Sequence, residues 1–275
     1  MWRKFLEEVE QTENAVVFGL GDYLDWTRTT HRIPLKATWG EDDKAMAQLD
    51  ELVMDGLVYP FVDTIRKYAP NALKRGAFVT FVEGNHHGVF LATHTLKSGR
   101  TTTEEICRLL GIRYAGLSSW VRMTIYRSVG KQKMATGHNL NIVLNHSTSR
   151  SGKLAFSLAS AQRQLEGWRD VDVFLTANDH QLGHVLRQEI GCTSRGMARP
   201  IEYQQVIGKV GSFQKGYQVG PQSNNYVEKR FLHPSQLGWL SFDAHLYFRE
   251  LINAEKRSLG LHMGPESWRY ANFNV

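Results

Sequence analysis

The sequence predicts a mixed α/β fold, and three observations support that prediction. Apolar residues recur at helical spacing in several segments of the 275-residue chain. Short apolar runs typical of buried strands alternate with these segments. Four of the apolar runs end directly in Asp, Asn or His residues, as strands do where they open onto the edge of a sheet. Alternating helices and strands favour sheets that are covered by helices.

The composition is that of a globular protein, with 42% hydrophobic and 22% charged residues. No apolar run is long enough to span a membrane, and the N-terminal segment MWRKFLEEVE is too charged for a signal peptide, so we expect a cytoplasmic protein without a membrane partner. The two cysteines, Cys107 and Cys192, argue against a disulfide framework or a thiolate zinc site. The formal net charge of +6 favours anionic partners such as phosphate esters and nucleic acid.

In the first part of the chain, periodicity predicts helices interrupted by short strands. Trp2, Phe5, Leu6 and Val9 recur at helical spacing, so the chain is expected to begin inside an amphipathic helix. A second helix is expected over residues 42–68 and is closed by Pro70. A third is expected over residues 101–111, with Thr102 or Thr103 as N-cap and Gly111 as C-cap. Strands are expected over residues 15–19 and 77–82.

The second part of the chain predicts mainly strands. Strands are expected over residues 120–127 and 140–146, joined by a polar loop over 128–138, and a helix is expected over 153–168. Two further strands are expected over residues 171–180 and 183–190. An irregular segment over 191–225 and an alternating strand from Trp239 are expected to follow. We expect one domain over residues 1–190 and a C-terminal extension over 191–275 that completes a second sheet.

Polar side chains follow four of the predicted strands, at the point where each strand ends. They are Asp22 and Asp25 in GDYLD, Asn85 and His86 in GNHH, His146 in LNHS, and Asn178 and His180 in ANDH. Because the carboxyl ends of strands in α/β sheets gather at one edge, these side chains are expected to meet there. Oxygen and imidazole ligands without thiolates suit Mn, Fe, Zn or Mg. The pattern therefore predicts a metal centre built from four loops.

Each of these residues also has a purely structural explanation. Asp22 or Asp25 could cap the following helix, and Asn85 could simply form a turn. A single histidine at a strand end is more often a hydrogen-bonded loop residue than a metal ligand. The order of the four segments, each directly after a strand, favours the metal centre.

These motifs resemble the calcineurin-like metallophosphoesterases, whose pattern is DxH, GDxxD, GNH[DE], a single H and GHxH. The resemblance covers residues 15–190 and rests most specifically on GDYLD and GNH. It implies a four-layer αββα sandwich with mixed sheets, and hydrolysis of a phosphomonoester or phosphodiester by a metal-activated hydroxide. The spacing and the tail GSFQKGY…YVEKR…HPSQLGW are most similar to phage or prophage members, which implies a nucleic-acid or nucleotide substrate and a host cytoplasm.

The resemblance also implies roles for individual residues. Asp22 would bridge two divalent metal ions, Asn85 and His146 would bind the second ion, and His180 would bind the first. Asn178 occupies the position of the first histidine of GHxH, another ligand of the second ion. His86 would face the leaving group and protonate its oxygen, held in orientation by the Asp25 carboxylate.

The chain departs from the family pattern at three points. None of the residues before Asp22 forms DxH, so we expect the first strand of the fold to be missing. Asn178 stands where the pattern has a histidine, and His87 stands where it has an acid. The alternative hypothesis is therefore a weakly active or inactive form of this fold that binds nucleic acid or a protein partner.

Overall fold

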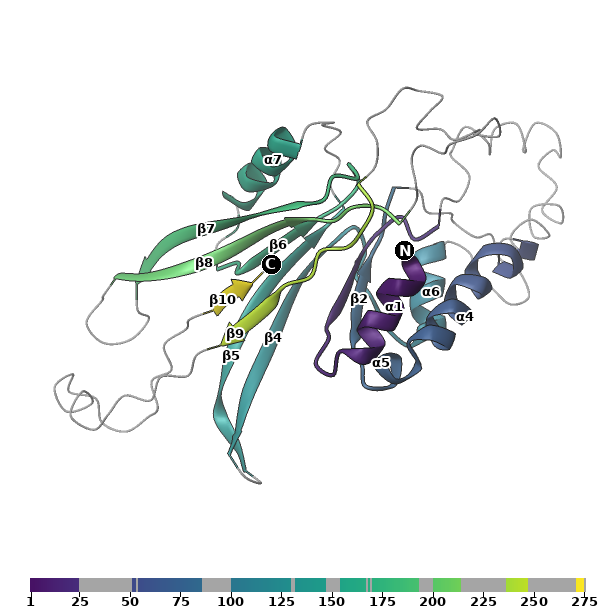
Figure 1. Cartoon of the computed structure of the whole chain (residues 1–275), viewed down its shortest axis with the longest axis horizontal. Coiled ribbons are helices and arrows are strands. Elements are labelled where there is room, and N and C mark those ends of the chain that lie inside the picture. Colours follow the sequence, from purple (N-terminus) through teal and green to yellow (C-terminus); the bar gives the residue numbers. More distant parts are fainter. Residues whose placement is uncertain are drawn as a thin grey trace. The chain divides into compact units, whose positions relative to one another are not determined.

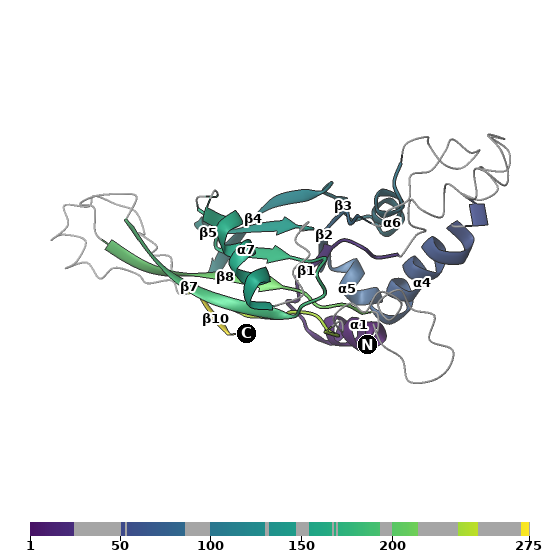
Figure 2. The same ribbon diagram turned by 90° about the horizontal axis from the view of Figure 1, so that it is seen from above.

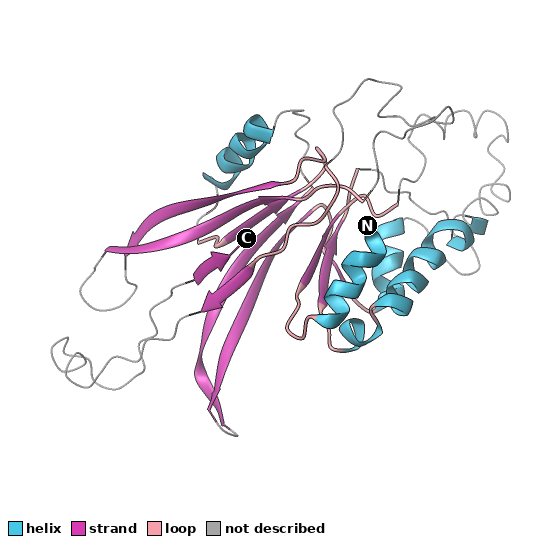
Figure 3. Ribbon diagram, in the orientation of Figure 1, coloured by secondary structure: helices cyan, strands magenta, loops and turns pink. Residues whose placement is uncertain are grey.

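The computed structural model divides the chain into two units, which we describe separately. Unit 1 comprises Met1–Ser119 and Leu144–Thr148, and unit 2 comprises Trp120–Val143 and Ser149–Val275 (Figure 1). The residues that the structure describes are 1–24, 51–52, 54–85, 100–129, 132–146, 154–166, 168, 170–192, 200–213, 236–246 and 271–274. Both units combine helices with strands, which confirms a mixed α/β fold (Figure 3). In these residues, no helix is both long enough and apolar enough to cross a membrane.

Unit 1 contains a parallel sheet in the order β1 (Val17–Leu20), β2 (Phe78–Val82) and β3 (Arg113–Tyr114). In the register of β1 and β2, Leu20 lies beside Val82, the last residue of each strand. Because the strands are parallel and end level with each other, the turns that follow them leave from the same edge of the sheet.

The helices of unit 1 share one core with β1 and β2, and Figure 1 shows α1, α4, α5 and α6 grouped beside β2. They are α1 (Trp2–Gln11), the π-helix η1 (Met54–Val58), α4 (Tyr59–Tyr68), α5 (Pro70–Lys74) and α6 (Thr102–Leu110). Leu6, Ile65 and Ile106 from three of these helices are fully buried in the core. The helical spacing of apolar residues thus places one face of each of these helices against the sheet.

The C-cap of α6 is the predicted residue, and its N-cap lies one residue before the predicted positions. Gly111 at the C-cap adopts the left-handed conformation with φ 70°, as predicted. The N-cap is Thr101, not Thr102 or Thr103, because the Thr101 side chain accepts a hydrogen bond from the Glu104 amide at 3.1 Å. The three consecutive threonines carry equivalent hydroxyl groups, so the sequence alone does not show which of them is the N-cap. The backbone conformation decides this.

Unit 2 is built on a five-stranded sheet in the order β4-β5-β6-β8-β7. The strands are β4 (Ser118–Val129), β5 (Gln132–Asn145), β6 (Val173–Thr176), β7 (Gly183–Cys192) and β8 (Pro200–Lys209), and a separate antiparallel pair is formed by β9 (Asp243–Leu246) and β10 (Ala271–Asn274). Helix α7 (Leu154–Glu166) packs on β6, β7 and β8 (Figure 2), and Val143, Phe174 and Ile207 are buried in the core it covers.

Two expectations for this unit were wrong. The expected loop over 128–138 is largely strand, since residues 128–129 belong to β4 and 132–138 to β5. Backbone pairing between strands does not require apolar side chains. The segment 191–225 was expected to be irregular, but β8 lies within it and pairs with both β6 and β7. Its apolar residues Val206 and Ile207 are fully buried. The domain boundary at residue 190 stays a prediction.

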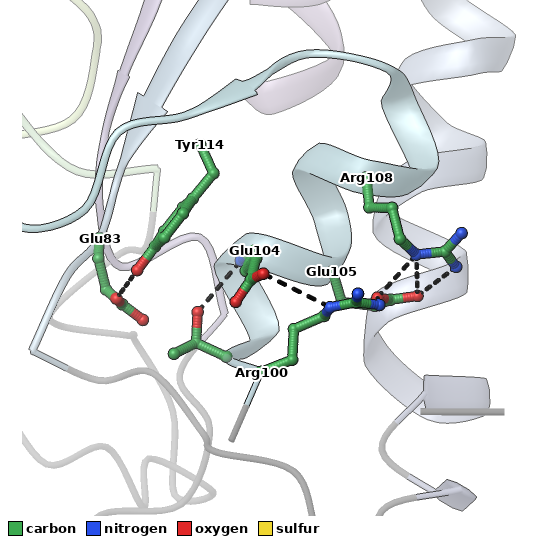
Figure 4. A network of polar contacts seen from close by, with 7 residues as sticks. Glu83, Arg100, Glu104, Glu105, Arg108 and Tyr114 are labelled. Carbon is green, nitrogen blue, oxygen red and sulfur yellow. Dashed lines mark hydrogen bonds and ion pairs between the residues drawn. The ribbon is translucent and has the colours of Figure 1, made fainter. Parts of the chain in front are cut away.

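A buried ion-pair cluster fixes the start of α6 (Figure 4). The Glu105 side chain is 1% exposed and lies 2.7 Å from Arg100 Nη1. Arg108 Nε donates to both of its oxygens at 2.9 and 3.0 Å. Burial alone would raise the pKa of Glu105, but the hydrogen bonds and charges of Arg108 and Arg100 outweigh it, so the pKa lies below its ordinary value.

This cluster predicts an acid-dependent contribution to stability. Glu105→Gln should lower the free energy of unfolding by about 1–3 kcal/mol at pH 7, because it removes hydrogen bonds to a buried charge. Since the folded-state pKa is depressed, this contribution is present above the unfolded-state pKa of about 4.3 and is lost as the pH falls through the folded-state value. Urea unfolding between pH 7 and pH 3 measures it. The control Glu104→Gln, at a 40% exposed side chain, should change the free energy by less than about 0.5 kcal/mol.

Candidate metal centre

The turn after β1 has an unusual backbone conformation. Gly21 and Asp22 have φ values of 91° and 50°, both in the left-handed region, which a short polar side chain such as that of aspartate tolerates better than most. The Tyr23 hydroxyl donates a hydrogen bond to the Val82 carbonyl oxygen at 3.0 Å. Burial raises the pKa of Tyr23 well above its ordinary value, so the hydroxyl keeps its proton and stays a donor. The turn is thereby fastened to the end of β2.

The turn after β2 lies in direct contact with the turn after β1. A Cβ atom at Gly84 would stand 1.9 Å from Asp22 Oδ1 and 2.2 Å from the Asp22 backbone nitrogen. A Cβ atom at Gly21 would stand 2.5 Å from His146 Nδ1 and 2.7 Å from Gly84 Cα. Neither position has room for a side chain, so the glycines of GDYLD and GNHH are required by the close approach of the two backbones.

His146, the residue directly after β5, joins these two turns. Its side chain is 4% exposed. Its Nδ1 donates a hydrogen bond to the Leu20 carbonyl oxygen at 2.6 Å, because a carbonyl oxygen can only accept. This bond places the ring proton on Nδ1 and turns Nε2 toward Asn85 Oδ1 at 2.9 Å and Asp22 Oδ2 at 3.2 Å.

The atoms around His146 Nε2 suit a cation. In the neutral ring with a proton on Nδ1, Nε2 carries a lone pair that faces the Asp22 carboxylate. If the oxygen and nitrogen of the Asn85 carboxamide exchanged places, the carboxamide could donate an N–H group to Nε2. The Asp22 carboxylate has no hydrogen to donate, so it cannot form a hydrogen bond with the Nε2 lone pair. A divalent cation placed among these atoms would interact favourably with all three. An Nδ1–H bond to a backbone carbonyl is also the usual way in which a metal-binding imidazole is oriented.

The donor set fits a hard or borderline divalent ion. Asp22 Oδ2, Asn85 Oδ1 and His146 Nε2 provide one carboxylate oxygen, one carboxamide oxygen and one imidazole nitrogen, a set that suits Mn, Fe, Zn or Mg. Within the described ranges, no group of three or more His, Cys, Asp or Glu side chains lies close enough to hold a metal ion. The third donor of this cluster is the amide of Asn85, which is exposed at the surface.

The structure therefore brings together Asp22, Asn85 and His146, three of the residues that the motifs singled out. Their role as metal ligands stays a prediction. Asp25 and His86, the predicted orienting acid and proton donor, lie outside the described residues.

Asn178 and His180 lie in unit 2, in the segment that follows β6. Both have left-handed backbones, with φ values of 90° and 55°. The residue between them, Asp179, accepts a hydrogen bond from Lys209 Nζ, and both of these side chains are almost completely buried. The Gln236 amide donates to the His180 carbonyl oxygen at 2.9 Å. Contacts inside unit 2 thus hold this segment in place, and its role as a metal-binding element stays a prediction.

Sequence patterns missed several residues that shape the site. Tyr23 fastens the first turn, and Glu83, directly before Gly84, accepts a hydrogen bond from Tyr114. Glu83 adjoins a recognised motif, but its position alone suggests no role. Tyr114 lies near Glu83 only because β3 pairs with β2, with Tyr114 beside Phe81, and no local pattern reveals that register.

Comparison with known proteins does not assign the chain to a family. No protein-family model matches the sequence, and no curated protein matches it. The resemblance to calcineurin-like metallophosphoesterases stays a prediction from the motifs, and the candidate metal centre rests on its own geometry.

The contact between the two turns predicts a strong effect of one methyl group. Gly84→Ala should lower the free energy of unfolding by about 1–3 kcal/mol and displace Asp22 from His146, because the new Cβ would overlap Asp22. Urea unfolding measures the first effect, and the nitrogen chemical shifts of the His146 ring measure the second. Gly56→Ala is the control, since a Cβ there has nothing within 4 Å. Equal behaviour of the two variants would contradict the close contact.

Proposed function

We propose that the chain is a metal-dependent phosphoesterase that hydrolyses a phosphomonoester or a phosphodiester on a four-layer αββα sandwich of the calcineurin-like type. The convergence of Asp22, Asn85 and His146 carries this proposal. These residues follow three different strands, and His146 stands 126 positions after the Leu20 carbonyl that orients it. The same residues occupy the metal-binding positions of the GDxxD, GNH and single-histidine motifs.

Asp22, Asn85 and His146 would hold one divalent ion through the atoms that already face one another. A divalent ion bound there would polarise a phosphoryl oxygen and lower the pKa of a water molecule. The motifs assign His180 and Asn178 to the same centre, with Asp22 as a carboxylate shared between two ions.

His86 and Asp25 would supply the proton chemistry. His86 directly follows Asn85 in the sequence, and in the proposed reaction its imidazolium would protonate the leaving oxygen. The Asp25 carboxylate would orient the ring and keep it cationic. The net charge of +6 favours a polyanionic substrate, which supports a nucleic acid or a nucleotide.

A second candidate function is a non-catalytic module of the same fold that binds nucleic acid or a protein partner. The observation in its favour is Asn178, which supplies an amide where the family pattern has an imidazole. An amide oxygen is a weaker ligand than an imidazole for borderline ions such as Zn. Binding of a single-stranded DNA oligonucleotide in the presence of EDTA, without hydrolysis when Mn²⁺ is supplied, would support this function over the enzyme.

Metal binding and hydrolysis can be measured on the same set of variants. We expect the full chain to bind Mn²⁺ in calorimetric titrations and to hydrolyse bis(4-nitrophenyl) phosphate only with the metal. His146→Ala removes a proposed ligand and Asp22→Asn removes the negative charge of another, so each should weaken Mn²⁺ binding by at least about 10-fold and abolish hydrolysis. Asp63→Asn, at an exposed aspartate of α4, should behave as the wild type. The same metal-independent behaviour in all four proteins would overturn the proposal.

The proton-donor role makes a separate prediction. His86→Ala should lower kcat by roughly 10²–10⁴-fold, the usual contribution of a general acid, while Mn²⁺ affinity stays near that of the wild type. The neighbouring His87→Ala is the matched control and should change kcat by less than about 3-fold, since the proposed reaction gives it no proton to transfer. Similar losses in both variants would show that the segment matters only for its shape.

A further inference from the structure

A buried acid directly precedes the metal-binding turn without taking part in the proposed metal centre. Glu83 is 4% exposed, and its carboxylate accepts a hydrogen bond from the Tyr114 hydroxyl (Figure 4). Burial, together with the hydrogen bond to Glu83 and its charge, raises the pKa of Tyr114 to about 12. The hydroxyl therefore keeps its proton over the physiological pH range and remains the donor of this bond.

The backbone ties the same residue to the neighbouring strand. The Glu83 amide donates to the Gly116 carbonyl oxygen at 2.7 Å, and the Ala115 amide donates to the Phe81 carbonyl oxygen at 3.0 Å. The chain after β3 thus runs alongside the end of β2. Glu83 is held to this segment by its backbone and by its side chain, while the next residue, Gly84, lies against Asp22.

We infer that Tyr114 and Glu83 are positioning residues for the candidate metal centre: their hydrogen bond fixes the Glu83–Asn85 turn so that Asn85 Oδ1 faces His146 Nε2. This inference rests on the proposed function, because it assigns the pair to the same metal centre.

The physical reason is the freedom of Gly84. A glycine between Glu83 and Asn85 lets the backbone approach Asp22, but it also leaves the turn with many accessible conformations. A metal ligand must be held by its neighbours to within a fraction of an ångström. The hydrogen bond to the buried Glu83 carboxylate, two residues before Asn85, can hold the turn in this way. Groups that hydrogen-bond directly to a metal ligand typically change metal affinity by 10–100-fold when they are removed. Because the Tyr114–Glu83 bond acts through the backbone beside Asn85, we expect the lower end of that range.

Tyr114→Phe tests the inference in the full chain, because it deletes only the hydroxyl. We expect about 10-fold weaker Mn²⁺ binding by calorimetry. In the metal-free protein, we expect amide hydrogen exchange at Gly84 and Asn85 to become about 10-fold faster, since the turn loses one of its restraints. Glu83→Met removes the acceptor at similar volume and should produce both effects. Glu83→Gln keeps an oxygen that can accept from Tyr114, so it should leave the exchange rates near those of the wild type.

Thr80→Val is the matched control. The Thr80 hydroxyl donates to the Arg113 carbonyl oxygen at 3.0 Å, so this variant also loses one buried hydroxyl bond between β2 and β3, away from the turn. It should change neither Mn²⁺ affinity nor exchange at Gly84 and Asn85 by more than about 3-fold.

The outcomes distinguish failure of the positioning role from failure of the proposed function. Equal Mn²⁺ binding and exchange in the wild type and Tyr114→Phe would overturn the positioning role while leaving the proposed function intact. Equal losses in Tyr114→Phe and Thr80→Val would also overturn it, because general weakening of the sheet would then be the cause. A wild type that does not bind Mn²⁺ would overturn the proposed function, and the positioning of a metal ligand with it. The exchange rates would still show whether the hydroxyl fixes the turn.

Discussion

The close contact between Gly84 and Asp22 is the constraint on which the candidate metal centre depends. It exists because β1 and β2 are parallel neighbours that end level with each other, with Leu20 beside Val82. Two turns leaving the same edge of a sheet would normally be kept apart by their side chains. Here glycines at positions 21 and 84 remove that separation, so the backbones meet and the polar groups of both turns reach one point.

His146 adds a ring nitrogen to the polar groups of the two turns. Its bond to the Leu20 carbonyl oxygen uses one ring nitrogen to hold the other near Asp22 and Asn85. Gathering a carboxylate, an amide oxygen and a ring nitrogen in a small volume costs free energy unless a positive charge is shared among them. Under the proposed function, a cation bound there would therefore stabilise the folded state, so metal binding would be coupled to folding.

The sequence predicted that Asp22, Asn85 and His146 would meet, but it missed parts of the sheets. Asp22 and Asn85 could be singled out because polar residues that follow parallel neighbouring strands gather at one edge of a sheet. His146 follows β5 of the five-stranded sheet, so its meeting with them does not follow from that rule. Strand β8 was missed because its polar residues obscure the short apolar core of Val206 and Ile207, and its identity as a strand depends on pairing with β6 and β7. The contact between Tyr114 and Glu83 was missed for the same reason, since it exists only in the register of β2 and β3.

In the described residues of unit 1, the polar surroundings of Glu105 and of His146 differ in chemistry. Glu105 is surrounded by the N–H groups of Arg100 and Arg108, so its charge is balanced by the protein itself. Around His146 Nε2, the oxygen atoms of Asn85 and Asp22 face a nitrogen of the ring that donates its Nδ1 proton to the Leu20 carbonyl oxygen. The first cluster is complete with the chain's own residues and stabilises α6. The second places a carboxylate oxygen and a carboxamide oxygen within 3.2 Å of an imidazole nitrogen, which is the arrangement that the proposed metal centre requires.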